Sequence, residues 1–452
     1  MTGGQALEPR IPLPAEEPAG QALVAPPSGG LVLAAVAAGV LGGAAATVFR
    51  ELVRLINELA YGFDLEQMAS AASRLAWWWP PLVLGAGGLA VGVYVHFLLP
   101  QRRPHGVADV IEATVLRGVA LDLRSGLATG FGAAASLGFG ASVGREGPVV
   151  HLGACLAAWL GRVLALPPSA GRVVLGAGVA GAIGASFNAP LAGMFFALEV
   201  VVARFAFSSF APVALGAAAG TLLGHLRYGE APAFVVPHDW GLVSLGELPA
   251  FLLLGLVSAV AAWLFVASAF LVDSAFHRLR CPRAVRPAVA GIAVGCLAMV
   301  DPRILGVGYE ATSAVLAHGF DLRQLVLLAV LKVTATALCL GAGFVGGVFS
   351  PALFLGCMLG GAFGLVAAMV APDLASAHNA YALVGMGAVA GAVLGAPLST
   401  AVMMVELTGD ITFTLMVLSA TVLASLVARR LGLRSFFHAQ LSRREARQSS
   451  SR

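Results

Sequence analysis

Charged residues are scarce in this sequence. Only 11% of its 452 residues are charged, 59% are hydrophobic, and the mean hydropathy is +0.89. Because soluble globular domains carry about 25% charged residues, this composition excludes an ordinary soluble protein. Apolar runs of roughly 20 residues, the length needed to cross the hydrocarbon core of a bilayer, recur from residue 31 to residue 430. We therefore predict an all-α integral membrane protein with many membrane-crossing segments.

Cysteine and several common site motifs are also scarce or missing. The chain has five cysteines, four of them inside apolar runs, and none forms a C-x-x-C pair, so neither a disulfide framework nor a zinc site is predicted. The sequence contains neither an H-E-x-x-H motif nor a Walker loop. We expect no metal, no cofactor and no nucleic-acid partner.

We expect no secretory signal peptide in the N-terminal region. Residues 1–28 have no basic segment followed by an apolar one and are rich in Pro, Gly, Ala and Glu, so we predict a disordered tail there. The transmembrane domain is expected over residues 29–435. A short basic cytoplasmic tail is expected over residues 436–452.

The basic residues, although few, are clustered. The net charge is +4, and the clusters lie at Arg102-Arg103, from Arg278 to Arg286 and from Arg429 to Arg452. Under the positive-inside rule these clusters predict cytoplasmic ends, and the basic C-terminus is the strongest of the three signals.

Gly and Pro divide the apolar part of the chain into segments, several of which are too short to span a bilayer. In lipid, broken helices persist only where protein or a water-filled cavity satisfies the loosened backbone groups, so the short segments predict a transport pathway. The segments lie at about 31–58, 80–99, 124–142, 147–164, 172–185, 190–204, 208–224, 247–271, 285–300, 322–342, 348–370, 380–395, 397–407 and 412–430.

An internal repeat supports a pathway. The sequence PVVHLG beginning at Pro148 resembles PALFLG beginning at Pro351, and A-P-L followed by a glutamate nine residues after the proline occurs at both Pro190 and Pro397. The offsets are 203 residues (148 to 351) and 207 residues (190 to 397). Such repeats predict a transporter whose site lies between two halves near the membrane midplane, and spacing alone leaves open whether they are inverted. The predicted halves are residues 106–225 and 305–430.

Glu146, in the stretch VGREGPVVHLG, is the main candidate functional residue. A carboxylate in an apolar helix end costs several kcal/mol unless it is paired or faces water. Pro148 predicts that a helix begins at Glu146, and a helix N-terminus binds anions through its free N–H groups. The carboxylate would then compete with a permeating halide and act as a gate. The alternative is that Arg145 merely neutralises Glu146.

The corresponding stretch of the second half, GGVFSP from Gly346 to Pro351, carries no acid. Its glycines free backbone N–H groups and its proline begins another helix, so two helix N-termini are expected to face one ion. The alternative is a glycine-rich packing turn.

Other polar residues in apolar segments have structural interpretations. Glu199 and Glu406 are expected to act as anchors whose carboxylates reach the interface or a loop N–H. Lys332, the single lysine in the chain, is expected to snorkel or to pair with a carboxylate. His151 is expected to pack between helices with a hydrogen bond to backbone.

One motif points to a different class of protein. Residues 140–144 match G-x-S-x-G, which would make Ser142 the nucleophile of an intramembrane serine hydrolase. That motif requires a preceding strand and ordered His and acid partners, whereas this run of small residues is expected to be helical and to let helices approach closely. We expect no enzyme and keep the hydrolase as a remote alternative.

Together these motifs resemble the CLC family of chloride channels and proton-coupled anion transporters, over about residues 31–445. The resemblance rests on three motifs in order: GREGP at 144–148, FNAPLAG at 187–193 with Glu199 following, and GVFSP at 347–351, the family's G-x-F-x-P. It implies a CLC-type inverted repeat of many tilted and broken helices, and a homodimer with one pore in each subunit. It also implies an inner-membrane location with both termini cytoplasmic. The match is to the bacterial type without C-terminal regulatory domains.

The resemblance also implies roles for individual residues. Glu146 corresponds to the external gating glutamate. The residues expected to bind the central anion are His105, Gly106, Arg145, Gly147, Val348, Phe349 and Phe437.

Three positions depart from the family pattern, all on the inner half of the pathway. His105 replaces the serine of G-S-G-I-P whose hydroxyl contacts the central anion, and its ring is expected either to face the anion or to pack away from it. Val200 replaces the internal proton glutamate, so that proton-relay position is lost. Phe437 replaces the tyrosine of the inner gate.

The sequence therefore predicts CLC-type anion transport, with chloride as the default ion and the lipid bilayer as its setting. Because the usual proton-carrying group is missing, transport is expected to be passive or weakly proton-coupled and gated by Glu146. The alternative within the class is a proton-coupled chloride antiporter with a non-standard proton route through water or His105.

Overall fold

The structure is a computed structural model that describes residues 28–63, 70–71, 74–116, 119–203, 207–230, 234, 245–317, 319–372, 377–408 and 413–449. Its regular elements in these ranges are helices, and the one extended pairing there is an isolated bridge between Gly144 and Gly347. The predicted all-α fold is confirmed.

Seven described helices are long and apolar enough to cross a membrane. They match the longer apolar segments of the sequence closely. An apolar segment that crosses lipid must satisfy its own backbone hydrogen bonds, and a helix does so. These helices are α1 (Gly29–Tyr61), α3 (Trp79–Phe97), α7 (Pro168–Phe187), α9 (Phe207–Tyr228), α10 (Leu248–Arg278), α13 (Leu322–Ala342) and α14 (Phe349–Val370).

The remaining helices are shorter, as the division of the sequence by Gly and Pro predicts. The tail expected after residue 435 contains a helix, α18. The shorter helices are α4 (Val107–Leu116), α5 (Leu123–Gly138), α6 (Glu146–Val163), α8 (Pro190–Phe196, continued by a π-helix over Ala197–Val202), α11 (Arg286–Ala298), α12 (Tyr309–Ala317), α15 (His378–Leu394), α16 (Pro397–Thr408), α17 (Thr414–Arg430) and α18 (Phe436–Ser449).

The helix ends follow local sequence chemistry that is the same in both halves. Asn188 ends α7 with φ of 58°, and Gly395 ends α15 with φ of 69°. Asn and Gly are the residues that adopt this left-handed conformation at a helix C-terminus. Pro190 and Pro397 then begin α8 and α16 two residues later, where their missing N–H costs nothing.

Reciprocal contacts relate the two halves by a two-fold axis. The Glu406 carboxylate accepts from the backbone N–H groups at the start of α8, at 2.8 Å from Leu191 and 2.7 Å from Ala192. The Glu199 carboxylate accepts from the start of α16 in the same way, at 3.2 Å from Leu398 and 2.8 Å from Ser399.

An exchange in which each half gives the other the same contact is the signature of two-fold symmetry, as in an isologous interface. The predicted anchor roles of Glu199 and Glu406 thus have a specific form, since each carboxylate caps a helix of the opposite half. Two-fold symmetry between the halves is what an inverted repeat requires, the arrangement that spacing alone left open.

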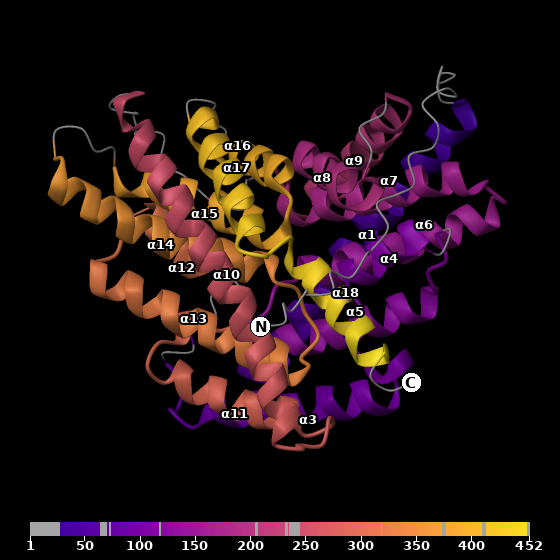
Figure 1. The fold of residues 1–452 in the computed structure, drawn as a ribbon. Helices are drawn as coiled ribbons and strands as arrows, with labels where there is room; N and C mark the ends of the chain where they lie inside the picture. The colour runs from indigo at the N-terminus through magenta and orange to yellow at the C-terminus, as the bar shows by residue number, and fades with distance from the viewer. Residues whose placement is uncertain are drawn as a thin grey trace, which may run out of the picture.

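The two halves lie side by side in the molecule (Figure 1). Helices α4 to α9 gather on one side, and α12 to α17 gather on the other, with α3 and α11 packed together at one end. Helix α18 crosses in front, between the two groups. The C-terminal helix is therefore positioned to touch both halves.

Candidate functional site

Glu146 is the first residue of α6, as predicted, and its side chain is only 5% exposed. Its carboxylate accepts hydrogen bonds from the Tyr309 hydroxyl at 3.1 Å, from the Ser350 hydroxyl, and from the Ser350 backbone N–H at 3.4 Å. Ser350 lies in the first turn of α14, where N–H groups have no partner within the helix. The carboxylate from one half therefore lies at the N-terminus of a helix from the other half.

Arg145 makes only a long ion pair with Glu146. Its Nε is 3.9 Å from the carboxylate, while its Nη2 donates to the Ser186 carbonyl at 2.8 Å and its guanidinium lies 4.8 Å from the centre of the Tyr309 ring. The nearest donors to Glu146 are thus Ser350 and Tyr309. Neutralisation by Arg145 does not by itself explain why Glu146 is buried here.

The turns that precede α6 and α14 are bound directly to each other. The Gly144 N–H donates to the Gly347 carbonyl and the Gly347 N–H donates to the Gly144 carbonyl, both at 2.7 Å. Gly144 and Gly347 are 203 residues apart and are equivalent in the repeat. Because a Cβ added to Gly347 would lie 2.9 Å from the Gly147 nitrogen, this close approach requires glycine.

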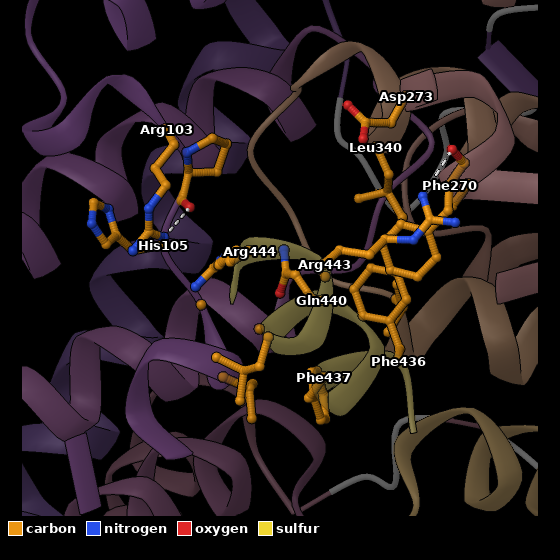
Figure 2. A pocket seen from close by; sticks show the side chains of 18 of the residues that line it. Arg103, His105, Phe270, Asp273, Leu340, Phe436, Phe437, Gln440, Arg443 and Arg444 are labelled. Atoms are coloured by element: carbon orange, nitrogen blue, oxygen red, sulfur yellow. Dashed lines mark hydrogen bonds between the residues drawn. The ribbon is translucent and has the colours of Figure 1, made fainter. Parts of the chain in front are cut away.

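A large cavity of about 1050 Å³ leads to these turns. It is lined by five of the residues predicted to bind the anion and by the lost relay position, Val200, whereas Glu146, Arg145 and Phe349 are not in its lining. Figure 2 shows part of this cavity, with α18 running along it. The predicted anion-binding residues in its lining are His105, Gly106, Gly147, Val348 and Phe437.

His105 both lines the cavity and packs against another histidine. Its ring stacks on that of His151, with centroids 5.7 Å apart and planes at 19°, and its Nδ1 is 3.5 Å from the Thr129 hydroxyl. The ring therefore has the packing contacts of the second alternative, and whether it faces an anion stays a prediction. His151 differs from its prediction, because its contacts are this ring and the Cys155 thiol at 3.7 Å instead of a backbone group.

The rim of the cavity is basic. Eight arginines and four acidic residues line it, so its fixed charge is positive and attracts anions. All three basic clusters of the sequence contribute to this one mouth. The arginines are Arg102, Arg103, Arg283, Arg286, Arg434, Arg443, Arg444 and Arg447.

Tyr309 is a site residue that the sequence motifs did not reveal. It follows a loop in which Gly306 and Gly308 adopt φ of 56° and 89°, and Lys332 holds this loop by donating to the carbonyls of Ile304 at 2.9 Å and Gly306 at 2.8 Å. Lys332 is fully buried. The prediction that Lys332 snorkels or pairs with a carboxylate was wrong, because two backbone carbonyls solvate its ammonium group.

Ser142 lies in a turn between α5 and α6, not in a helix as predicted. The element before it is a helix, whereas a nucleophile elbow follows a strand. Its hydroxyl is 3.2 Å from the Thr336 hydroxyl. These contacts indicate that Ser142 packs at the turn between α5 and α6.

The fold and the site define a class of protein: a multi-pass helical membrane protein with an inverted repeat and a cavity at the repeat interface, which is the architecture of a membrane transport protein. The sequence model described as voltage gated chloride channel matches residues 87–429. The chain belongs to this family, the CLC family.

Individual similar proteins support this family assignment. A ClcB-like protein of Ralstonia nicotianae is 34% identical over 413 residues, which are 90% of this chain and 96% of that protein. The H(+)/Cl(-) exchange transporter ClcA of Vibrio cholerae is 28% identical over 402 residues, covering 87% of this chain and 85% of that one. Among solved structures, a slow cyanobacterial Cl-/H+ antiporter has a TM-score of 0.83 at 22% identity, covering 93% of this chain and 99% of its own.

Proposed function

We propose that this protein moves small anions across the membrane, with chloride as the default ion, and that Glu146 gates their path. The observation that carries the proposal is the carboxylate of Glu146 at the N-terminus of α14, 3.4 Å from the Ser350 nitrogen. A helix N-terminus carries about half a positive charge and unpaired N–H donors. A halide would compete with Glu146 for these donors, so the path opens when the side chain swings away or takes up a proton.

The central anion is proposed to bind where the cavity reaches the starts of α6 and α14. Gly147 and Val348 flank those helix starts and line the cavity, together with His105 and Gly106. Backbone N–H groups there would replace part of the anion's hydration shell. Arg145 and Phe349 complete the proposed set, Arg145 through its charge and Phe349 through its backbone N–H.

We propose passive or weakly proton-coupled transport. Val200 lines the cavity at the position where a proton-carrying glutamate is expected, and a valine side chain cannot bind a proton. Phe437 has no hydroxyl to hold an anion at the inner end. Anions would then pass without an obligatory proton.

The second candidate is proton-coupled antiport by another route. Two observations favour it: the imidazole rings of His105 and His151 stack beside the cavity, and two of the similar proteins are named as chloride and proton exchangers. Histidine can bind and release protons, so this pair would supply a relay in place of Val200, although burial lowers the pKa of His105 to about 4.

Reconstitution into liposomes with simultaneous chloride and proton recording separates the candidates. For passive transport, an imposed chloride gradient moves chloride with little or no uphill proton movement, and a proton gradient alone fails to drive chloride uphill. Uphill proton pumping at a fixed chloride-to-proton ratio would establish antiport instead. Loss of that pumping in His105→Ser would then identify His105 as the relay. No chloride flux at all would reject both candidates.

We further propose a homodimer in the cell inner membrane with both termini in the cytoplasm. The three basic clusters gather around one cavity mouth, which fits a cytoplasmic mouth under the positive-inside rule. Exposed leucines on α8, α9, α16 and α17 offer an apolar face to lipid or to a second copy. Protease accessibility of the C-terminus in sealed vesicles tests the orientation, and subunit counting by single-molecule photobleaching tests the dimer.

A further inference from the structure

Asp109, in the first turn of α4, gathers three hydrogen-bond donors on one carboxylate. Its Oδ2 accepts from the Gly106 N–H at 2.9 Å, and its Oδ1 accepts from Arg103 Nη2 at 2.7 Å and from Arg444 Nη1 at 3.0 Å. The Asp109 side chain is 8% exposed. Burial alone would raise the pKa of the Asp109 carboxyl, but the Arg103 hydrogen bond and the charges of Arg444 and Arg103 lower it to about 2.

The three donors come from two separate elements that line the cavity. Arg103 and Gly106 belong to the segment that carries His105, whereas Arg444 belongs to α18. In Figure 2, Arg444 reaches from α18 toward the segment with Arg103 and His105. A single buried carboxylate therefore joins the segment that carries His105 and Gly106 to the helix that carries Phe437.

Arg444 and Phe437 occupy the same face of α18. They are seven residues apart, which is about two turns of an α-helix, so their side chains project in a similar direction. Phe437 lies in the first turn of α18 and lines the cavity. Holding Arg444 in place consequently fixes the rotation of α18 and the position of the Phe437 ring.

We propose that Asp109 is a positioning residue that holds Phe437 and the His105-Gly106 segment at a fixed separation and so sets the affinity of the inner end of the pathway for its anion. This inference rests on the proposed anion transport. Asp109 does not contact the anion, because its charge would repel it. It acts by holding the Gly106 backbone through its N–H and by holding α18 through Arg444.

Other contacts hold α18 on the side away from Asp109, and they are weaker than the buried contacts of Asp109. Arg447 pairs with Asp273 at 2.5 Å, and Arg443 donates to the Phe270 carbonyl at 3.3 Å while lying over its ring (Figure 2). The Arg447 side chain is 53% exposed, and exposed pairs contribute about 0–1 kcal/mol. These contacts keep α18 near α10 without touching the His105-Gly106 segment.

The test compares Asp109→Asn, Arg444→Gln and their combination by chloride flux from liposomes over a range of chloride concentration and pH. Asp109→Asn keeps an acceptor for Gly106 but loses the charge that holds both arginines. We expect the half-saturating chloride concentration to rise by about tenfold in Asp109→Asn, with a smaller rise in Arg444→Gln. Adding Arg444→Gln to Asp109→Asn should raise the half-saturating chloride concentration little further, because the contact between Asp109 and Arg444 is already broken.

The pH profile distinguishes positioning from general damage. Glu146 and its donors do not touch Asp109, so the dependence of flux on external pH should stay like that of the parent in all three variants. Asp109→Glu, which retains the charge, should recover much of the affinity. The matched control is Arg447→Gln, which removes one ion pair between α18 and α10 and should change the half-saturating concentration by less than about threefold.

Several results would overturn the inference while leaving anion transport intact. They are parent-like affinity in Asp109→Asn, additive effects in the double variant, or an Arg447→Gln effect as large as that of Arg444→Gln. If Asp109→Asn does not fold, Arg444→Gln is the test variant, and its half-saturating chloride concentration should again rise above that of the parent. Absence of flux in the parent would instead reject the proposed function itself.

Discussion

The two turns that precede α6 and α14 have the same backbone arrangement and different side chains. Gly144 and Gly347 bind each other through reciprocal 2.7 Å hydrogen bonds, and each turn leads into a helix two residues later. At the equivalent positions 203 residues apart, the first half has Glu146 and the second has Phe349. The repeat thus supplies two helix ends with free N–H groups, and one difference between the halves places an acid at one of them, the residue proposed as the gate.

The first half also depends on the second for the hydrogen bonds that hold Glu146. Glu146 accepts its hydrogen bonds from Ser350 and Tyr309, both in the second half, and Ser350 is equivalent to Gly147. Glycine at 147 leaves only a backbone N–H, whereas serine at 350 adds a hydroxyl donor. The asymmetry is therefore a matched pair: an acid in one turn and its donor in the other.

Removing the acid should erase the difference between the turns and has the largest expected effect. Glu146→Ala or Glu146→Gln should leave anion flux that depends little on external pH, because the carboxylate that competes with the anion is gone. Flux recorded from liposomes at several external pH values measures this. If both variants kept the rate and the pH dependence of the parent, Glu146 would have only a structural role.

Forcing the two turns apart should cost stability. Gly347→Ala would insert a Cβ 2.9 Å from the Gly147 nitrogen, so the turns must separate, at a cost of about 1–3 kcal/mol. The midpoint of thermal unfolding in detergent should fall, and flux should fall with it. Gly161→Ala in α6 is the control, since nothing lies within 4 Å of its added Cβ and alanine favours a helix. Equal midpoints for the two variants would contradict close packing of the turns.

Removing one hydrogen-bond donor to Glu146 should make its buried position less stable while the carboxylate remains. Tyr309→Phe deletes one hydrogen bond to Glu146, and such bonds contribute about 0.5–1.5 kcal/mol, so flux should rise by about two- to tenfold. The rate of chloride efflux from liposomes measures the change. Tyr94→Phe, which loses a hydrogen bond to the Ala128 carbonyl, is the matched control and should leave flux near the parent value. A parent-like rate in Tyr309→Phe would assign the closed position to Ser350 alone.

The smallest effect is expected next to the turns, at Ser142. Ser142→Ala removes a hydroxyl that lies 3.2 Å from Thr336 and should leave anion flux within about fivefold of the parent. A fluorophosphonate probe should not label the protein, as judged by mass spectrometry. Covalent labelling at Ser142 would favour the hydrolase over the transporter.

Much of the fold was predictable because its signals are local. The apolar segments, and the prolines that begin α6, α8, α14 and α16, lie in the sequence where the helices are found. The helices that the segment list missed are α4, α12 and α18. Helices α4 and α12 are short and α18 is rich in arginine, so no long apolar run in the sequence predicted them.

The contacts between segments were less predictable, because they join residues far apart in the chain. The buried position of Lys332 depends on the carbonyls of Ile304 and Gly306, and a buried ammonium needs acceptors that only the folded chain brings to it. The Asp109 carboxylate is likewise completed by Arg444, 335 residues away. Neither pairing has a local sequence signal.

The sequence by itself determined that this is a membrane protein built from two related halves, that helices begin at Glu146 and Phe349, and that the family is CLC. Composition, proline position and repeat spacing are properties of the chain and need no three-dimensional information. The tertiary structure decided which groups surround Glu146, that Glu199 and Glu406 cap each other's halves, and that Asp109 joins the His105-Gly106 segment to α18. Those contacts depend on how the inverted halves pack, and packing brings together polar groups that the sequence separates by hundreds of residues.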